Sequence, residues 1–255
     1  MNHELRHKLD LIELLVRQEF AIKFKRTSLG FLWSLINPLM TAMVLFFAFK
    51  VFMRFGMDDY ALFLLTALFP WTWFTGAVAM SANTLISNMP LIKKVIFPKQ
   101  YLLLSVVIVQ MINFLLAVPI ILLLVLFYGH TPGISWLYGI PILTFIQFFI
   151  VYGLTMIVSI TNAYFRDMEH LITVLLSLLF WMTPIIYPLS AIPPQYQKFL
   201  VLNPMMSLVN SWRNLFLHNT IDWKSVLTSA VIALVVYIAG VLVMKKLEKN
   251  LDEVL

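Results

Sequence analysis

Five long runs without a charged side chain dominate this sequence. Between successive Asp, Glu, Lys and Arg residues, the runs cover residues 31–49, 60–92, 100–165, 171–197 and 225–244. A helix needs roughly 20 predominantly apolar residues to cross a bilayer. Each run is long enough for at least one crossing, so the sequence predicts an all-α integral membrane protein.

The third run is too long for one crossing. It contains the segment Tyr-Gly-His-Thr-Pro-Gly at 128–133, whose residue types favour a turn. Dividing the run there gives six predicted transmembrane helices within one transmembrane domain, residues 1–255. The six helices are expected at 31–53, 60–87, 100–127, 136–163, 171–187 and 223–244.

Residues 190–219 do not fit a seventh crossing, because they contain Pro193-Pro194, Asn203-Pro204 and the charged Lys198 and Arg213. We predict two short helices there, near 194–202 and 205–217. They are expected to form a re-entrant hairpin that dips into the outer leaflet and returns.

The composition agrees with this interpretation. Hydrophobic residues make up 61% of the 255 residues and charged residues only 12%, whereas about 25% of the residues in a soluble domain are charged. The N-terminal segment mixes acids with bases and has no short apolar core, so we expect no removable signal peptide. The chain has no Cys, which excludes disulfides and thiolate metal sites.

The basic residues predict the orientation. Of the 18 Lys and Arg residues, 13 lie in residues 1–30, the 93–99 and 166 connections, and the C-terminal tail. Basic residues concentrate on the cytoplasmic side of membrane proteins. We therefore expect both termini in the cytoplasm and the chain in the inner (plasma) membrane. This topology accounts for the net charge of +6, and no nucleic-acid partner is expected.

Two cytoplasmic segments carry further signals. Residues 4–26 are too charged to span, but Leu9, Ile12, Val16 and their neighbours at helical spacing predict an amphipathic helix at the membrane surface. Residues 89–98 have a proline near each end, Pro90 and Pro98, and combine two lysines with several apolar side chains. Such side chains at the membrane surface need something to pack on, which indicates a partner protein.

The lack of acidic residues in the predicted transmembrane helices, and of a phosphate-binding loop, excludes several classes of function. All twelve acidic residues lie at the termini or in connections. Ion-coupled carriers place ionisable groups at membrane depth, and acid–base enzymes need positioned carboxylates or histidines. There is no glycine-rich phosphate loop ending in Lys-Ser or Lys-Thr. We therefore expect no catalytic site, no metal and no cofactor in this chain, and any directional work must draw on another polypeptide.

Several motifs resemble one family, and they follow its order over nearly the whole chain. The first covers residues 23–38, Lys-Phe-Lys-Arg-Thr-Ser-Leu-Gly-Phe-Leu-Trp-Ser-Leu-Ile-Asn-Pro. Others are Phe-Pro-Trp at 69–71, Leu-Ile-Lys-Lys-Val-Ile-Phe-Pro at 91–98, Tyr-Phe-Arg-Asp at 164–167 and Pro-Ile-Ile-Tyr-Pro at 184–188. Together they resemble the membrane subunits of type-2 ABC exporters for lipid-linked surface polysaccharides, such as O-antigen, capsule and teichoic acid.

The resemblance implies a homodimer of this subunit with two copies of a separate ABC ATPase, which would bind ATP and Mg²⁺. It also implies that 4–26 and 89–98 sit on the ATPases as coupling elements and that 190–219 shapes the outer mouth. The residues expected to couple to the ATPase are Arg17, Lys23, Lys25, Arg26, Leu91, Lys93, Lys94, Val95, Phe97, Pro98, Arg166 and Asp167. The residues expected to line the polysaccharide passage are Trp33, Asn37, Phe74, Asn83, Trp181 and Tyr187.

Two other functions are weighed against polysaccharide export. A related type-2 exporter would move a drug or a small lipid and leave surface glycan unchanged. A membrane-embedded glycosyl or lipid transferase would turn over its substrate without a partner, and it would need the acidic or metal-binding site that this sequence lacks.

Overall fold

The computed structural model describes residues 3–25, 27–94, 97–200, 203–249 and 251. Within these residues every regular element is helical. The elements are α1 (His3–Phe24), η1 (Gly30–Leu32), α2 (Trp33–Phe46), η2 (Phe47–Phe52), α3 (Tyr60–Ser87), α4 (Met89–Lys94), α5 (Gln100–Phe127), α6 (Ser135–Tyr164), α7 (Met168–Met182), η3 (Leu189–Ala191), α8 (Pro194–Leu200), α9 (Met206–His218) and α10 (Trp223–Glu248).

In the part of the chain that the structure describes, five helical stretches are long and apolar enough to cross a membrane: Gly30–Phe52, α3, α5, α6 and α10. The first joins a 3₁₀ turn, α2 and a π-helical turn. The five stretches differ in how much of their most apolar 18 residues is buried. The buried share is 78% in α3, but only 17% in Gly30–Phe52 and 22% in α10. Helix α3 is therefore the centre of the bundle, and the other two lie at its edge.

The fifth predicted crossing is shorter in the structure than the expected 171–187. Helix α7 has 15 residues, about 22 Å at 1.5 Å per residue, against a hydrocarbon core of about 30 Å. It ends because Thr183 is extended, with φ −89° and ψ 135°, and the following Pro184 disfavours helical backbone at Thr183. Residues 183–186 continue as a buried, non-helical segment.

Helices α6 and α10 approach each other at two glycines. A Cβ on Gly240 would lie 2.5 Å from the backbone oxygen of Gly153, and one on Gly153 would lie 2.6 Å from the backbone oxygen of Val236. Small residues allow this close backbone packing between membrane helices.

Helices α3, α6 and α9 are joined by a buried amide. The Gln147 side chain on α6 donates to the Pro70 carbonyl of α3 at 2.8 Å. It also accepts a 2.8 Å hydrogen bond from the Trp212 indole of α9. Because a buried amide is costly unless its donor and acceptor are both satisfied, these bonds fix the relative positions of the three helices.

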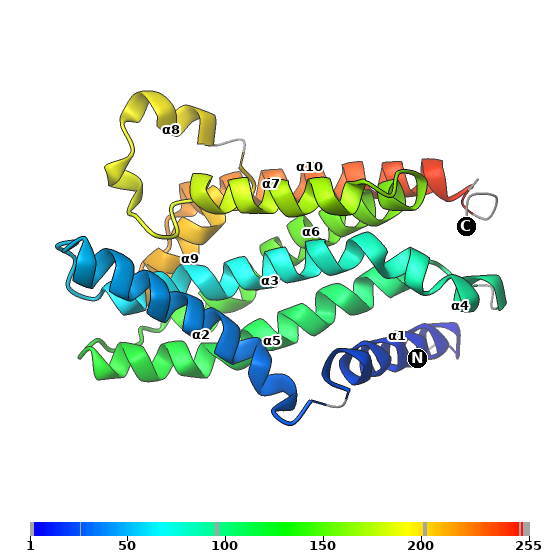
Figure 1. Ribbon diagram of the computed structural model, residues 1–255, viewed down its shortest axis with the longest axis horizontal. Helices are drawn as coiled ribbons and strands as arrows, with labels where there is room; N and C mark the ends of the chain where they lie inside the picture. The colour runs from blue at the N-terminus through cyan, green and yellow to red at the C-terminus, as the bar shows by residue number, and fades with distance from the viewer. Residues whose placement is uncertain (1–2, 26, 95–96, 201–202, 250, 252–255) are drawn as a thin grey trace.

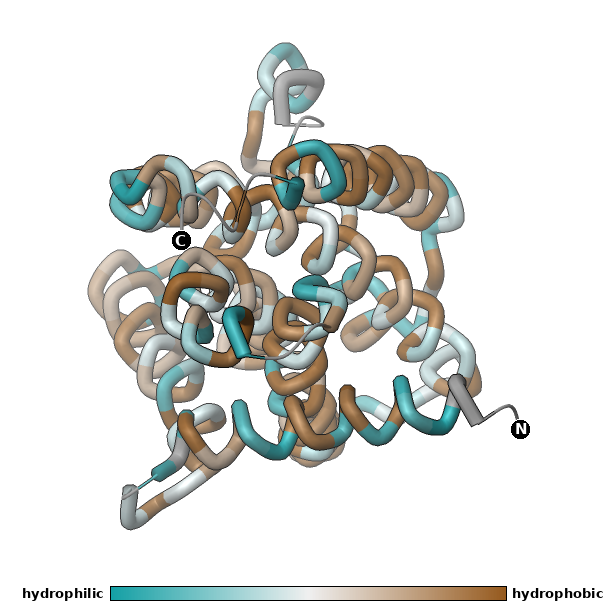
Figure 2. The backbone as a smooth tube through the Cα atoms, turned by 90° about the vertical axis from the view of Figure 1, so that its right-hand side faces the viewer, coloured by the Kyte–Doolittle hydropathy of each residue, from teal (hydrophilic) through white to brown (hydrophobic). Residues whose placement is uncertain are grey.

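Both termini and α4 lie at one end of the bundle, which we call the inner end (Figure 1). There α1 runs across the bundle rather than along it (Figure 2). Of its apolar side chains, Leu15 is buried and Leu11 packs against the core, while Leu9 is 49% exposed. The helix thus contacts the bundle through a different side of its surface from the one that carries Leu9.

At the opposite, outer end, α9 packs against α3, α6 and α10, and α8 stands away from the bundle (Figure 1). These helices occupy the region where the sequence predicts two short helices; their depth in a membrane stays a prediction. Asn219 ends α9 in a left-handed conformation, φ 53°. Its side chain accepts from the Gly133 N–H at 2.7 Å and donates to the Thr131 carbonyl at 2.8 Å, which ties α9 to the α5–α6 loop.

A buried arginine supports the non-helical segment after α7. The Arg213 guanidinium on α9 donates to the carbonyls of Pro184 and Ile185 at 2.8 and 3.0 Å and lies 3.5 Å from the centre of the Phe63 ring. Arg is suited to this role because its planar donors can bond two acceptors while its face stacks on an aromatic ring.

Candidate functional site: a groove and an inner surface

An open groove of about 560 Å³ lies between α3 and α7. We call it the α3–α7 groove. Its lining consists of aromatic, hydroxyl and small side chains from the two helices: Trp71, Thr75, Gly76, Ala79, Thr173, Leu176, Ser177, Phe180 and Trp181.

The aromatic rings in the groove form a connected series. The Trp71 and Phe180 ring centres are 5.9 Å apart, and those of Phe180 and Trp181 are 5.5 Å apart. Trp181 is 58% exposed, so its ring is accessible from the surface. Aromatic faces of this kind pack well against the apolar faces of ring-shaped ligands.

The hydroxyl groups in the groove are oriented by their own helices. Thr75 donates to the Trp71 carbonyl at 3.0 Å, and Ser177 donates to the Thr173 carbonyl at 2.9 Å. Because a hydroxyl keeps acceptor capacity after donating its hydrogen, these oxygens can still receive hydrogen bonds from a ligand. The groove therefore combines aromatic surface with hydroxyl acceptors and carries no charge on its described lining residues.

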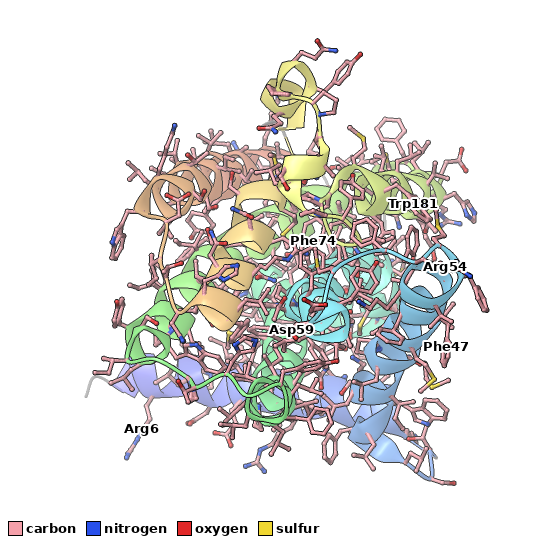
Figure 3. All side chains as sticks on the ribbon, turned by 90° about the vertical axis from the view of Figure 1, so that its left-hand side faces the viewer. Arg6, Phe47, Arg54, Asp59, Phe74 and Trp181 are labelled. Carbon is pink, nitrogen blue, oxygen red and sulfur yellow. The ribbon has the colours of Figure 1, made fainter. Side chains whose placement is uncertain are left out.

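The predicted passage residues do not form one wall. Trp181 lines the α3–α7 groove, and the Tyr187 hydroxyl donates to the Trp181 carbonyl at 2.6 Å. Phe74 is 1% exposed and lies in the middle of the bundle, whereas Trp181 lies toward its edge (Figure 3). Phe74 therefore lines no surface here, and its neighbour Trp71, 5.3 Å away between ring centres, reaches the groove instead.

The other three predicted passage residues lie elsewhere. Trp33 and Asn37 border a separate cavity between α1, α2, α3 and α5. Asn83 is exposed on α3, at an inner pocket that Glu19 and Glu169 also line. Their part in a passage stays a prediction.

The coupling segment 89–98 is partly packed on its own chain. Leu91 and Phe97 are half-buried against the core, while Lys93, Lys94 and Pro98 are exposed. Val95 lies outside the described residues. Leu91 and Phe97, which the sequence assigns to a partner, thus have a packing site within the bundle. The two lysines are the charged, exposed part of the segment.

The remaining predicted coupling residues differ in exposure. Arg17 pairs with Glu13 at 2.7 Å on the exposed side of α1, and Lys25 is exposed. Arg166 and Asp167 are exposed in the α6–α7 connection. Arg26 lies outside the described residues.

Lys23 turns into the bundle. Its Nζ donates to the Gln110 side chain of α5 at 3.0 Å, and burial lowers the pKa of Lys23 to about 8. Its positive charge is thus directed toward α5, and a role in docking an ATPase stays a prediction.

Asn162 is a connecting residue that the sequence analysis does not single out. Its side chain, 1% exposed, donates to the Ala82 carbonyl of α3 at 2.9 Å and to the Asn83 side chain at 3.2 Å. It also accepts from the Glu169 N–H at 3.0 Å. Asn162 thereby joins the α6–α7 connection to the end of α3 from which α4 continues. In the sequence it is one of several polar residues within apolar runs, and nothing there identifies its partners.

Comparisons with known proteins identify the family. The model of the ABC-2 type transporter family matches residues 10–217. An O-antigen export system permease protein of Klebsiella pneumoniae is 33% identical over 255 residues, which is 100% of this chain and 98% of the relative.

Relatives from other organisms also match. A Myxococcus xanthus O-antigen export system permease protein is 34% identical over 91% of this chain and 90% of its own length. An Escherichia coli polysialic acid transport protein is 26% identical over 78% of each chain. The family model and these similarities over most of the chain show that this chain is a membrane permease of the ABC-2 type transporter family.

Proposed function

We propose that this chain is the channel-forming subunit of an ATP-driven exporter that moves lipid-linked polysaccharide, most specifically O-antigen, to the outer side of the inner membrane. The observation that carries the proposal is the α3–α7 groove. Its three aromatic side chains and its oriented hydroxyls suit a chain of sugar rings, which present both apolar faces and hydroxyl donors. The named functions of the relatives support the same substrate class.

A homodimer would complete the passage. One side of α7 is apolar and exposed, including Leu171, Val174, Leu175 and Leu178, and the edge helix Gly30–Phe52 also carries exposed apolar residues. In a symmetric pair these surfaces would meet lipid or the second copy, with the grooves of both copies facing a shared space. Helix α7 and residues 183–187 would together make the fifth crossing and bring the total to six.

A separate ABC ATPase would supply the energy by docking on the inner end. Two exposed pairs lie on the inner connections: Lys93 and Lys94 on α4, and Arg166 and Asp167 between α6 and α7. Asn162 joins these connections, because it bonds both α3 and the Glu169 N–H. This link offers a route from an ATPase to the groove, because α3 and α7 are the helices that continue from those connections.

A pair of tryptophan variants tests the role of the groove. Trp181 and Trp223 are similarly exposed, 58% and 60%, but only Trp181 lines the groove. We expect Trp181→Ala to reduce surface polysaccharide several-fold in the native host and Trp223→Ala to leave it nearly unchanged. Equal polysaccharide levels in both variants, at equal protein levels, would contradict the proposed role of the groove.

Deletion of the gene distinguishes the alternative functions. The proposal predicts that completed lipid-linked glycan accumulates inside the cell while surface glycan disappears. Unchanged surface glycan together with sensitivity to a small amphiphile would instead support a drug or small-lipid exporter. Loss of glycan synthesis, with turnover by the purified chain, would support a transferase.

A further inference from the structure

A second cavity, of about 330 Å³, lies between α1, α2, α3 and α5 and shares one lining residue, Gly76, with the groove. We call it the Lys23 cavity. Polar groups on its wall come from Lys23, Asn37, Gln110 and Asn113, and aromatic rings come from Trp33, Phe69, Trp73 and Phe114. Among the described residues that line it there is no Asp or Glu, so the wall is positive.

The depth of the cavity follows from the helices that border it. Gln110 is ten residues after Gln100, where α5 begins, which places it about 15 Å along that helix. A helix of 28 residues is about 42 Å long and extends beyond a hydrocarbon core of about 30 Å. With α5 upright and centred on the core, about 6 Å of it would project at the inner end, which would put Gln110 about 9 Å inside the inner boundary of the core. An ammonium group at that depth is costly without polar company.

Two buried polar atoms at the cavity lack a hydrogen-bond partner. They are the Trp73 indole Nε1, on a residue 1% exposed, and the Asn113 Oδ1, on a residue 6% exposed. The Asn113 Nδ2 already donates to the Gln110 Oε1 at 3.2 Å, so its oxygen is left as an acceptor. Buried polar groups are normally satisfied, and both residues line the same cavity.

These groups define the chemistry of a ligand. The Trp73 N–H can bond an acceptor oxygen, and the Asn113 oxygen can accept from a donor such as a hydroxyl. The Lys23 ammonium, which already donates to Gln110, makes the cavity suited to an acceptor that carries negative charge. A phosphate ester whose neighbouring group carries a hydroxyl satisfies all three. A simple anion supplies the acceptors but not the donor.

The access to the cavity favours a lipid over a dissolved ion. Trp33 is 45% exposed and Asn37 is exposed at the start of α2, so the cavity borders the surface of the edge helix. The same helix exposes Phe31, Leu32 and Met40, an apolar surface along which an acyl or isoprenoid chain can lie. Tryptophan is also common at the membrane–water boundary.

We infer that the Lys23 cavity binds the phosphate and adjoining hydroxyl-bearing group of a lipid from the inner leaflet. The inference rests on the proposed function only for the identity of the lipid. If the exporter moves a lipid-linked glycan, that substrate presents a phosphate next to a sugar. A glycerol-bearing phospholipid offers the same chemistry.

The test measures lipid retained by the purified chain, by native mass spectrometry after exchange into detergent. Three probes are compared: a synthetic isoprenoid lipid whose phosphate carries one glucose, phosphatidylglycerol, and phosphatidylcholine, which is neutral overall and has no hydroxyl. Hydrogen bonds to charged groups are strong enough that we expect Lys23→Gln to lower retention of the first probe about tenfold. Lys25→Gln, which removes the same charge from an exposed position, should change it less than about twofold.

A second variant shows whether a loss of lipid retention is caused by misfolding. Trp73→Phe removes the indole N–H and keeps an aromatic ring, and it should also weaken retention at an unchanged melting temperature. Equal losses in Lys23→Gln and Lys25→Gln, equal retention of phosphatidylcholine, or full competition by inorganic phosphate would each overturn the inference.

The outcomes separate this inference from the proposed function. Selective retention of the glucosyl lipid supports a substrate site, and equal retention of phosphatidylglycerol supports a site for a membrane lipid. Selective lipid retention in a chain whose deletion leaves surface glycan intact would uphold the cavity and refute polysaccharide export.

Discussion

The backbones of Gly153 and Gly240 lie in direct contact, such that a Cβ on Gly240 would come within 2.5 Å of the Gly153 carbonyl oxygen. No side chain can move aside there, because the opposing atoms belong to the main chain of α6. This contact sets the distance between α6 and α10.

A larger residue at this contact should separate the two helices. We expect Gly240→Leu to destabilise the protein by about 1–3 kcal/mol or more, the range for overpacked interiors. Gly56→Leu is the matched control, because a Cβ at Gly56 meets nothing within 4 Å. Thermal unfolding in detergent compares them, and equal melting temperatures would show that the helices separate at little cost.

Replacing Asn162 should loosen the inner connections. Asn162→Leu removes the bonds to α3 and to the Glu169 N–H and leaves buried partners unsatisfied, at about 1–3 kcal/mol. Hydrogen exchange at residues 165–170 should accelerate. Thr161→Val is the control, because the Thr161 hydroxyl donates only within its own helix in the structure. Protection that stays equal in both variants would refute the connecting role.

The start of α10 should respond to pH through Asp222. Its carboxylate accepts from the Lys224 N–H at 3.1 Å and from the Ser225 hydroxyl at 2.6 Å. The Ser225 bond, followed by the backbone bonds, lowers the pKa of Asp222 from its ordinary value. A lowered pKa stabilises the folded form above the unfolded pKa, and the contribution disappears as the pH falls through the folded pKa.

At pH 7 we expect Asp222→Ala to cost about 0.5–2 kcal/mol, as for other helix N-caps. The difference in stability between wild type and Asp222→Ala should shrink as the pH falls below 4. Asp222→Asn keeps a cap that does not titrate and serves as the control. A difference between wild type and Asp222→Asn that is independent of pH would contradict this assignment.

Reversing the charge on α4 should weaken the proposed ATPase contact. Lys93→Glu with Lys94→Glu places two negative charges on an exposed inner segment, where repulsion would replace attraction. We expect less ATPase to copurify and less surface polysaccharide. Lys245→Glu with Lys246→Glu applies the same change at the inner end of α10. Copurification that falls equally in both pairs would show that general charge, and not α4, governs assembly.

The sequence alone predicts the long helices closely. The expected segments 60–87 and 100–127 coincide with α3 and α5, because charged and turn-forming residues bound an apolar run at the point where a helix leaves the membrane. The short α7 was harder to predict: its run stays apolar past Met182, and the helix is ended by the backbone preference before Pro184.

The candidate site could be predicted only in part. Composition points to aromatic and amide groups within the spans, and Trp181 does lie in an open groove. The burial of Phe74 and the inward turn of Lys23 depend on how helices rotate against each other. A helix that is apolar on all sides has no amphipathic pattern, so its sequence does not show which side faces which neighbour. The hydrogen-bond partners of Gln110 and Asn162 could therefore be identified only from the tertiary structure.

The bonds from α6 to α3 occur at two separate heights, one at the Pro70 carbonyl and the other at the Ala82 carbonyl. Two attachments prevent sliding as well as tilting, so these helices, together with α10 at the Gly153 contact, behave as one stationary frame. We therefore expect any widening of a passage to involve the edge helix Gly30–Phe52 and α7, whose backbone leaves the helical conformation at Thr183.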